Sequence, residues 1–122
     1  MKILKCNNCG AKVEVIDDCK CKGCGIMCCG AQMTEQKANS VECAVEKHLP
    51  VYEKVGAYIV VSVPHVMEDN HYIEAICFES KKISAKKYFK PGEQPKAVFP
   101  YVKGGKISSI CNKHGIWTTN VE

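Results

Sequence analysis

The sequence predicts an all-β protein in which an antiparallel β-sandwich follows a small cysteine-rich metal-binding module. Seven of the ten cysteines fall within residues 1–33. From Pro50 onward, short apolar runs rich in β-branched residues alternate with turn-forming residues, a pattern typical of antiparallel sheets. No segment after residue 50 repeats its apolar residues with a helical period. Together these observations place the cysteines in one module and the strands in another.

The expected strands begin with a hairpin, Val51–Val55 and Tyr58–Val63, that turns at Gly56. Five further strands are expected at residues 72–78, 83–89, 97–102, 106–110 and 116–121. About seven short strands separated by turns predict a sandwich.

The polar stretch before the strands, residues 34–47, is expected to form a short helix that begins near Asn39 or Ser40. We place the cysteine-rich module at residues 1–36 and the sandwich at residues 37–122.

Composition limits the kinds of partner and the cellular location that we expect. No apolar run is long enough to span a bilayer, which takes about 20 residues, and the N-terminus has no signal-peptide core. We therefore expect a cytoplasmic protein without a membrane partner, in which clustered cysteines bind metal before they form disulfides. The net charge is +4 and arginine is absent, so a nucleic-acid interface built on guanidinium contacts is not expected.

All four histidines fall in three short segments that look like metal-ligand segments: Glu46–Pro50, Pro64–His71 and Cys111–Gly115. In the third segment two residues separate Cys111 from His114, which is chelating spacing. Four imidazoles and one thiolate exceed the four ligands that zinc prefers, and they suit a redox metal with an open sixth position. Iron is the metal that the pattern favours.

These segments resemble the superoxide reductases, and the likeness covers essentially the whole chain. It rests on Glu46–Pro50, Val63–Glu68, His71–Glu74, Lys90–Gly92, Cys111–Gly115 and Trp117. The N-terminal cysteines make the chain similar to desulfoferrodoxin, the two-iron form. The resemblance implies an immunoglobulin-like β-sandwich that carries a square-pyramidal iron. The implied ligands are His48, His65, His71 and His114 in the equatorial plane and Cys111 on the axis.

The resemblance also implies an activity, the one-electron reduction of superoxide to hydrogen peroxide. Lys47 is similar to the family's lysine that attracts superoxide and orders water for protonation. Glu46 is similar to the carboxylate that takes the sixth position in the resting ferric state. A small redox protein such as rubredoxin is the implied electron donor, and a homodimer is the implied assembly. The alternative is a zinc-loaded structural or regulatory module without redox activity.

The N-terminal cysteines are similar to the desulforedoxin pattern, a Cys-x-x-Cys followed by a Cys-Cys pair. Matching positions are Cys6, Cys9, Cys28 and Cys29. Four thiolates bind iron or zinc in a tetrahedron and help a module of this size to fold. Three further cysteines, at positions 19, 21 and 24, depart from the pattern. Either they are free thiols or accidental, which leaves the four matching positions as ligands, or a different set of cysteines binds a different centre, such as an iron–sulfur cluster.

Overall fold

The computed structural model describes residues 1–40 and 45–122, with side chains described for residues 1–40 and 47–122. The chain divides into two compact units, Met1–Lys37 and Ala38–Glu122. The division lies one residue beyond the boundary expected from the sequence. None of the helices in the described part of the chain is long and apolar enough to cross a membrane.

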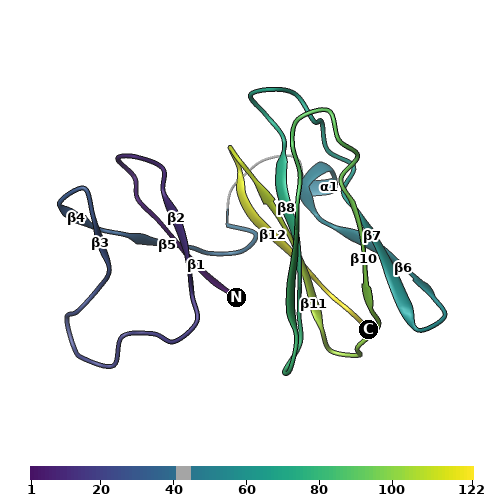
Figure 1. The fold of residues 1–122 in the computed structure, drawn as a ribbon, viewed down its shortest axis with the longest axis horizontal. Coiled ribbons are helices and arrows are strands. Elements are labelled where there is room, and N and C mark those ends of the chain that lie inside the picture. The colour runs from purple at the N-terminus through teal and green to yellow at the C-terminus, as the bar shows by residue number, and fades with distance from the viewer. Residues whose placement is uncertain (41–44) are drawn as a thin grey trace. The chain divides into compact units, whose positions relative to one another are not determined.

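The first unit contains two small antiparallel sheets (Figure 1). β1 (Lys2–Lys5) lies between β2 (Lys12–Val15) and β5 (Thr34–Gln36) in a three-stranded sheet, and β3 (Met27–Cys28) pairs with β4 (Ala31–Gln32). None of these strands was predicted. They are short, and only β1 contains buried residues, the adjacent Ile3 and Leu4, so their sequence carries little of the alternation of apolar and polar residues that marks a half-buried strand.

The second unit has seven antiparallel strands in two sheets, as the sequence predicts. The three-stranded sheet has the order β10-β7-β6 and the four-stranded sheet has the order β12-β11-β8-β9. The strands are β6 (Val51–Val55), β7 (Tyr58–Ser62), β8 (Ile73–Glu79), β9 (Ser84–Tyr88), β10 (Lys96–Pro100), β11 (Lys106–Cys111) and β12 (Gly115–Asn120). Each lies within two residues of its predicted bounds.

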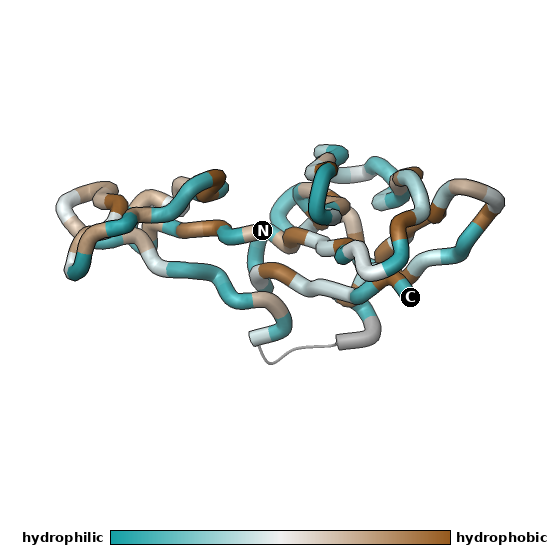
Figure 2. Tube along the Cα trace, turned by 90° about the horizontal axis from the view of Figure 1, so that it is seen from below, coloured by the Kyte–Doolittle hydropathy of each residue, from teal (hydrophilic) through white to brown (hydrophobic). Residues whose placement is uncertain are grey.

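The core of the second unit lies between its two sheets. β7 contributes Ile59 and Val61, and β8 contributes Ile73, Ile76 and other buried residues. The rings of Phe78 on β8 and Phe99 on β10 stack 5.5 Å apart and join the sheets. Polar and apolar residues alternate along the tube in Figure 2, as expected where one face of each strand is buried.

The polar stretch expected to contain a helix from Asn39 or Ser40 is described only in part. Its first residues, 34–36, form strand β5, and a short helix, α1 (Val45–His48), lies at its end, whereas residues 41–44 lie outside the described residues. Asn39 instead has a left-handed backbone, with φ of 57°, and pairs with the edge of β12. Its side-chain amide accepts a hydrogen bond from the Thr118 N–H and donates one to the Thr118 carbonyl. This local bonding explains why an asparagine suits a turn better than a helix interior here.

Candidate metal centres

The five predicted ligands of the second unit meet at one end of the sandwich. His48 ends α1, His65 and His71 lie on the segment between β7 and β8, and Cys111 and His114 flank the hairpin between β11 and β12. The ligand atoms of all five side chains lie within 4.8 Å of one another. Segments up to 66 residues apart in the chain thus build one cluster.

The four imidazole rings form a square. Successive ring centroids are 4.6 Å apart for His48 and His65, 4.6 Å for His65 and His71, 4.9 Å for His71 and His114, and 4.9 Å for His114 and His48. The diagonal from His48 to His71 is longer, at 6.3 Å. Neighbouring rings meet edge to face, with interplanar angles of 73° to 85°.

The nitrogen atoms that face inward have the spacing of ligands around one metal ion. The Nδ1 atom of His114 lies 3.0 Å from Nε2 of His48 and 3.2 Å from Nε2 of His71. Two nitrogens at right angles on a metal, each bonded at about 2.1 Å, would be about 3.0 Å apart. The sulfur of Cys111 lies 3.5 Å from Nε2 of His65 and 3.8 Å from Nδ1 of His114. The donor set therefore fits one ion held by four nitrogens and a sulfur.

The tautomer of His65 is set by the backbone carbonyl of the next residue, Val66. Its Nδ1–H donates to the carbonyl of Val66 at 2.5 Å, which leaves Nε2 free to face the cluster. Burial lowers the pKa of His65, and burial followed by the charges of nearby His48 and His71 lowers the pKa of His114. Both shifts favour the neutral imidazole, which is the form that binds metal.

Cys111 is positioned by the sandwich core. It is 1% exposed and packs in the main hydrophobic cluster. The pairing of β11 with β8 shifts register between Ile110 and Cys111, because Ile110 pairs with Ala75 whereas Cys111 pairs with Ile73. Bulges of this kind redirect side chains next to functional sites. Here the register shift comes immediately before Cys111, the predicted thiolate ligand.

Other residues hold the ligand-bearing segments in place. The side chain of Asn112 accepts a hydrogen bond from the Tyr72 N–H at 2.9 Å and donates one to the Asn70 carbonyl at 3.0 Å. It thereby binds the backbone on both sides of His71. The ring of Trp117 packs 5.2 Å from that of His48, and its indole N–H donates to the His114 carbonyl at 3.1 Å. Sequence reasoning missed Asn112, because nothing in its local pattern reveals a partner 40 residues away.

The two predicted catalytic residues are only partly described. Lys47 lies beside His48 and is exposed, whereas the side chain of Glu46 lies outside the described residues. A second lysine, Lys113, is exposed beside His114, and its charge contributes to lowering the pKa of that histidine. No feature of the sequence distinguishes Lys113 from the other scattered lysines.

The predicted N-terminal ligands also meet. Cys6, Cys9, Cys28 and Cys29 form a second cluster whose sulfur atoms all lie within 4.8 Å of one another. Two of the sulfur–sulfur distances are 3.7 Å, between Cys9 and Cys28, and 3.9 Å, between Cys28 and Cys29. A tetrahedron of thiolates around one ion, with bonds of about 2.3 Å, has edges of about 3.8 Å. The spacing fits a single metal ion.

A tight turn explains how two adjacent cysteines reach the same point. Cys29 and Gly30 join β3 to β4 and both have positive φ, at 53° and 76°, as a type I′ hairpin turn requires. Glycine adopts this backbone readily, whereas Cys29 adopts it against its usual preference. The turn breaks the alternation that would send the side chains of Cys28 and Cys29 to opposite faces of a strand.

Hydrogen bonds shift the pKa values of Cys6 and Cys28 in opposite directions. Backbone N–H groups of Cys9 and Asn8 lower the pKa of Cys6 to about 6. Hydrogen bonding to Cys6 and Cys9 raises the pKa of Cys28 to about 12. The Cys6 thiol thus favours its thiolate form and the Cys28 thiol its protonated form, and a bound cation would favour the thiolate of Cys28.

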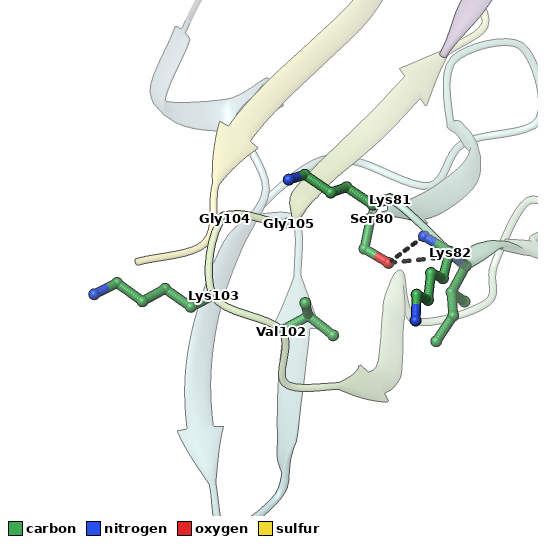
Figure 3. Close-up of a pocket in the computed structure, with 8 residues that line it drawn as sticks. Ser80, Lys81, Lys82, Val102, Lys103, Gly104 and Gly105 are labelled. Atoms are coloured by element: carbon green, nitrogen blue, oxygen red, sulfur yellow. Dashed lines mark hydrogen bonds between the residues drawn. The ribbon is translucent and has the colours of Figure 1, made fainter.

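A cavity of about 570 Å³ lies at the far end of β8 and β11 from the histidine cluster (Figure 3). It is lined by Ser80, Lys81, Lys82, Ile83, Val102, Lys103, Gly104 and Gly105. These residues offer no imidazole, thiolate or carboxylate, so the cavity is not an alternative metal site.

Comparison with known proteins assigns the family. Residues 40–120 match the sequence model of the desulfoferrodoxin family. The chain is 37% identical to a desulfoferrodoxin of Syntrophotalea carbinolica over 98% of this chain and 95% of that protein. It is 40% identical to a desulfoferrodoxin of Nitratidesulfovibrio vulgaris over 95% of this chain and 93% of that one. The fold is similar to the crystal structure of the superoxide reductase from Treponema pallidum, with a TM-score of 0.70, 24% identity, and coverage of 96% and 98% of the two chains. The chain therefore belongs to the desulfoferrodoxin family.

Proposed function

We propose that this chain is a superoxide reductase that converts superoxide to hydrogen peroxide at a mononuclear non-haem iron. The observation that carries the proposal is the square of imidazoles with a buried thiolate beside it. We assign His48, His65, His71, Cys111 and His114 as the ligands. Membership in the desulfoferrodoxin family supports the assignment. Iron bound there would supply one electron to superoxide, which also needs two protons to become hydrogen peroxide.

The ligands determine how readily such an iron would donate an electron. Cys111 contributes a thiolate, which raises electron density at a metal as a cysteinate does in thiolate-ligated haem. The four histidines are neutral donors, and burial helps to keep His65 and His114 neutral. Five donors also leave one position of an octahedron for a small anion, whereas zinc prefers a closed set of four. The donor set therefore favours iron over the zinc-loaded alternative.

Charged residues around the ligands act on the substrate. Lys47 and Lys113 are exposed and each adjoins a histidine ligand, so they raise the local concentration of an anion such as superoxide. We assign Lys47 a second role, ordering the water that protonates the reduced substrate. Glu46 precedes Lys47, and we assign its carboxylate as the additional ligand of the resting ferric state.

We assign a second iron to the cluster of Cys6, Cys9, Cys28 and Cys29. Its sulfur spacing supports a single ion, because an iron–sulfur cluster would insert several atoms between the thiolates. Four thiolates leave no open position, so this iron can transfer electrons but cannot bind superoxide. We propose a small redox protein such as rubredoxin as the donor, and a homodimer as the assembly.

The stoichiometry of peroxide tests the proposed reaction. Prereduced, iron-loaded protein is mixed with superoxide generated by pulse radiolysis, and both superoxide decay and peroxide yield are measured. A reductase forms one peroxide for each superoxide consumed, whereas a dismutase forms half as much. Protein loaded with zinc at both clusters is the control and should leave superoxide decay at its spontaneous rate. Half-stoichiometric peroxide, or equal activity with zinc, would contradict the proposal.

A further inference from the structure

The loop between β2 and β3 carries three cysteines that the two metal centres do not use. Within it, the structure joins Cys21 and Cys24 by a disulfide, and Cys19 is an exposed thiol. The loop runs outward from the strands that flank it (Figure 1). Cys21-Lys22-Gly23-Cys24 thus forms a Cys-x-x-Cys unit of its own within the first unit of the chain.

The disulfide makes little contribution to the fold. All residues from 16 to 27 are exposed, so the crosslink fixes no buried side chain. It spans only three positions in sequence, and a short loop gains little from closure because its ends are already close in the unfolded chain. Gly23 has φ of 69°, which turns the chain between the two cysteines without help from the crosslink. The Cys21–Cys24 disulfide can therefore break and form again without disturbing the sheets.

The same chain needs reduced cysteines elsewhere. This step rests on the proposed function, which requires five other cysteines to be thiolates that bind metal. A compartment that keeps them reduced also contains thiol reductants that attack an exposed disulfide. Exposed disulfides are the labile ones, whereas structural disulfides are shielded and resist reduction.

We propose that Cys21 and Cys24 are a redox-active dithiol–disulfide pair that exchanges electrons with thiol reductants. A reductant thiolate attacks one sulfur, forming a mixed disulfide and breaking the Cys21–Cys24 bond, and the other cysteine leaves as a thiolate. A second reductant thiol then attacks the mixed disulfide at the reductant's sulfur and releases the first cysteine. In sum, two reductant thiols give two electrons and two protons, so that one disulfide of the reductant and two thiols of the protein are formed. The module then has a two-electron exchange site in addition to its metal centre.

Equilibration with a thiol couple tests the proposal. The full-length, metal-loaded protein is incubated anaerobically in buffers that cover a wide range of reduced to oxidised glutathione. Free thiols are then blocked with an alkylating agent, and the disulfide is located by mass spectrometry of peptides. The expected result is complete and reversible conversion of the Cys21–Cys24 disulfide to the dithiol within this range, with no change in metal content. A pair that stays closed or stays open in every buffer, or a disulfide that maps to Cys19, would overturn the proposal.

Matched variants test whether this pair acts independently of the metal centres. Cys21→Ser and Cys24→Ser should each abolish the titration, whereas Cys19→Ser should leave its midpoint unchanged. All three variants should consume superoxide at the parent rate. If the pair titrates but the protein does not consume superoxide, the proposed function fails and the exchange site stands. If superoxide is consumed but the pair does not titrate, only the exchange site fails.

Discussion

The hydroxyl of Ser109 donates a hydrogen bond of 2.5 Å to the backbone carbonyl of His48, 61 residues earlier in the chain. Ser109 lies on β11 and is completely buried. The bond attaches the segment that precedes β6 to the centre of the four-stranded sheet. A second hydroxyl, that of Thr119, donates to the Pro50 carbonyl at 2.7 Å and strengthens the same attachment. The last residue of a four-residue helix is thus tied to a central strand of the four-stranded sheet.

Ser109→Ala should loosen His48 without removing any ligand. It leaves a buried carbonyl without its partner, which costs about 1–3 kcal/mol of unfolding free energy. Metal affinity should fall by about tenfold or more, as for other residues that support ligands. Ser108→Ala is the control, because Ser108 bonds Thr118 instead of a ligand segment. Urea unfolding and metal competition with a chelator measure both effects, and equal affinities for the two variants would contradict the prediction.

Cys111→Ser should abolish both the visible absorption of the ferric protein and its reaction with superoxide. A serine oxygen gives no thiolate-to-iron absorption and donates less electron density to the metal. Cys77→Ser is the matched control, because Cys77 is also a buried thiol, on β8, but it lies outside the cluster. Absorption spectra and pulse radiolysis provide the readouts. A Cys111→Ser protein that reacts at the parent rate would show that the ligand assignment is wrong.

Lys47→Ile should slow the second-order reaction with superoxide by about an order of magnitude, because it removes a positive charge next to the ligands. The rate should also depend less on ionic strength. Lys81→Ile is the control, since Lys81 is exposed in the turn after β8, at the far end of the sandwich (Figure 3). Both variants lose the same net charge. If they slow the reaction equally, overall charge and not the position of Lys47 governs the rate.

The metal-free protein should lose stability as the pH falls through the range below 6.5. Burial holds the pKa of His65 and of His114 below their ordinary value of 6.5, so the unfolded chain binds more protons than the folded chain as the solution is acidified. The stabilising contribution is present above pH 6.5 and is lost as the pH falls toward the folded-state pKa values. Urea unfolding at about pH 7.5 and at about pH 5.5 measures the difference. His114→Asn should reduce it, and an unaltered difference would exclude His114 as its source.

Serine at Cys9 or Cys29 should empty the N-terminal centre and loosen residues 1–37, because thiolate–metal bonds supply much of the folding free energy of a small module. Serine at Cys19 should change neither metal content nor spectrum. The histidine cluster should keep its iron in all three variants, because its ligands belong to a unit with its own core. Elemental analysis and amide hydrogen exchange check the result. Loss of the centre in Cys19→Ser would favour a different ligand set.

The strands of the second unit could be predicted from sequence because most of them carry buried apolar residues between turn-forming residues. In β7 and β8, branched and aromatic residues such as Ile59, Val61 and Phe78 occupy the core, and glycine or proline marks the turns. The histidines could be assigned to one metal site because all four lie in three short segments that look like metal-ligand segments, one of which also contains Cys111. The strands of the first unit could not be predicted, since they bury little and contain only two to four residues each.

The finer structure of the histidine cluster depends on contacts that no local pattern contains. The nitrogen that each ring presents, the bulge before Cys111 and the bonds of Ser109 and Asn112 all require the sheets to be paired. The disulfide in the cysteine-rich loop was also missed, because spacing alone does not separate a crosslink from two free thiols.

The positions of the two ligand sets along the chain bear on the order in which the protein matures. The four thiolates of the first centre are complete once residue 29 has been synthesised, and N-terminal segments fold first as a chain leaves the ribosome. The second centre needs Cys111 and His114, which are made after six of the seven sandwich strands have been started. Metal can thus enter the first centre during translation. Metal can enter the second centre only later, once the hairpin that carries Cys111 and His114 has been made and has joined the sheet.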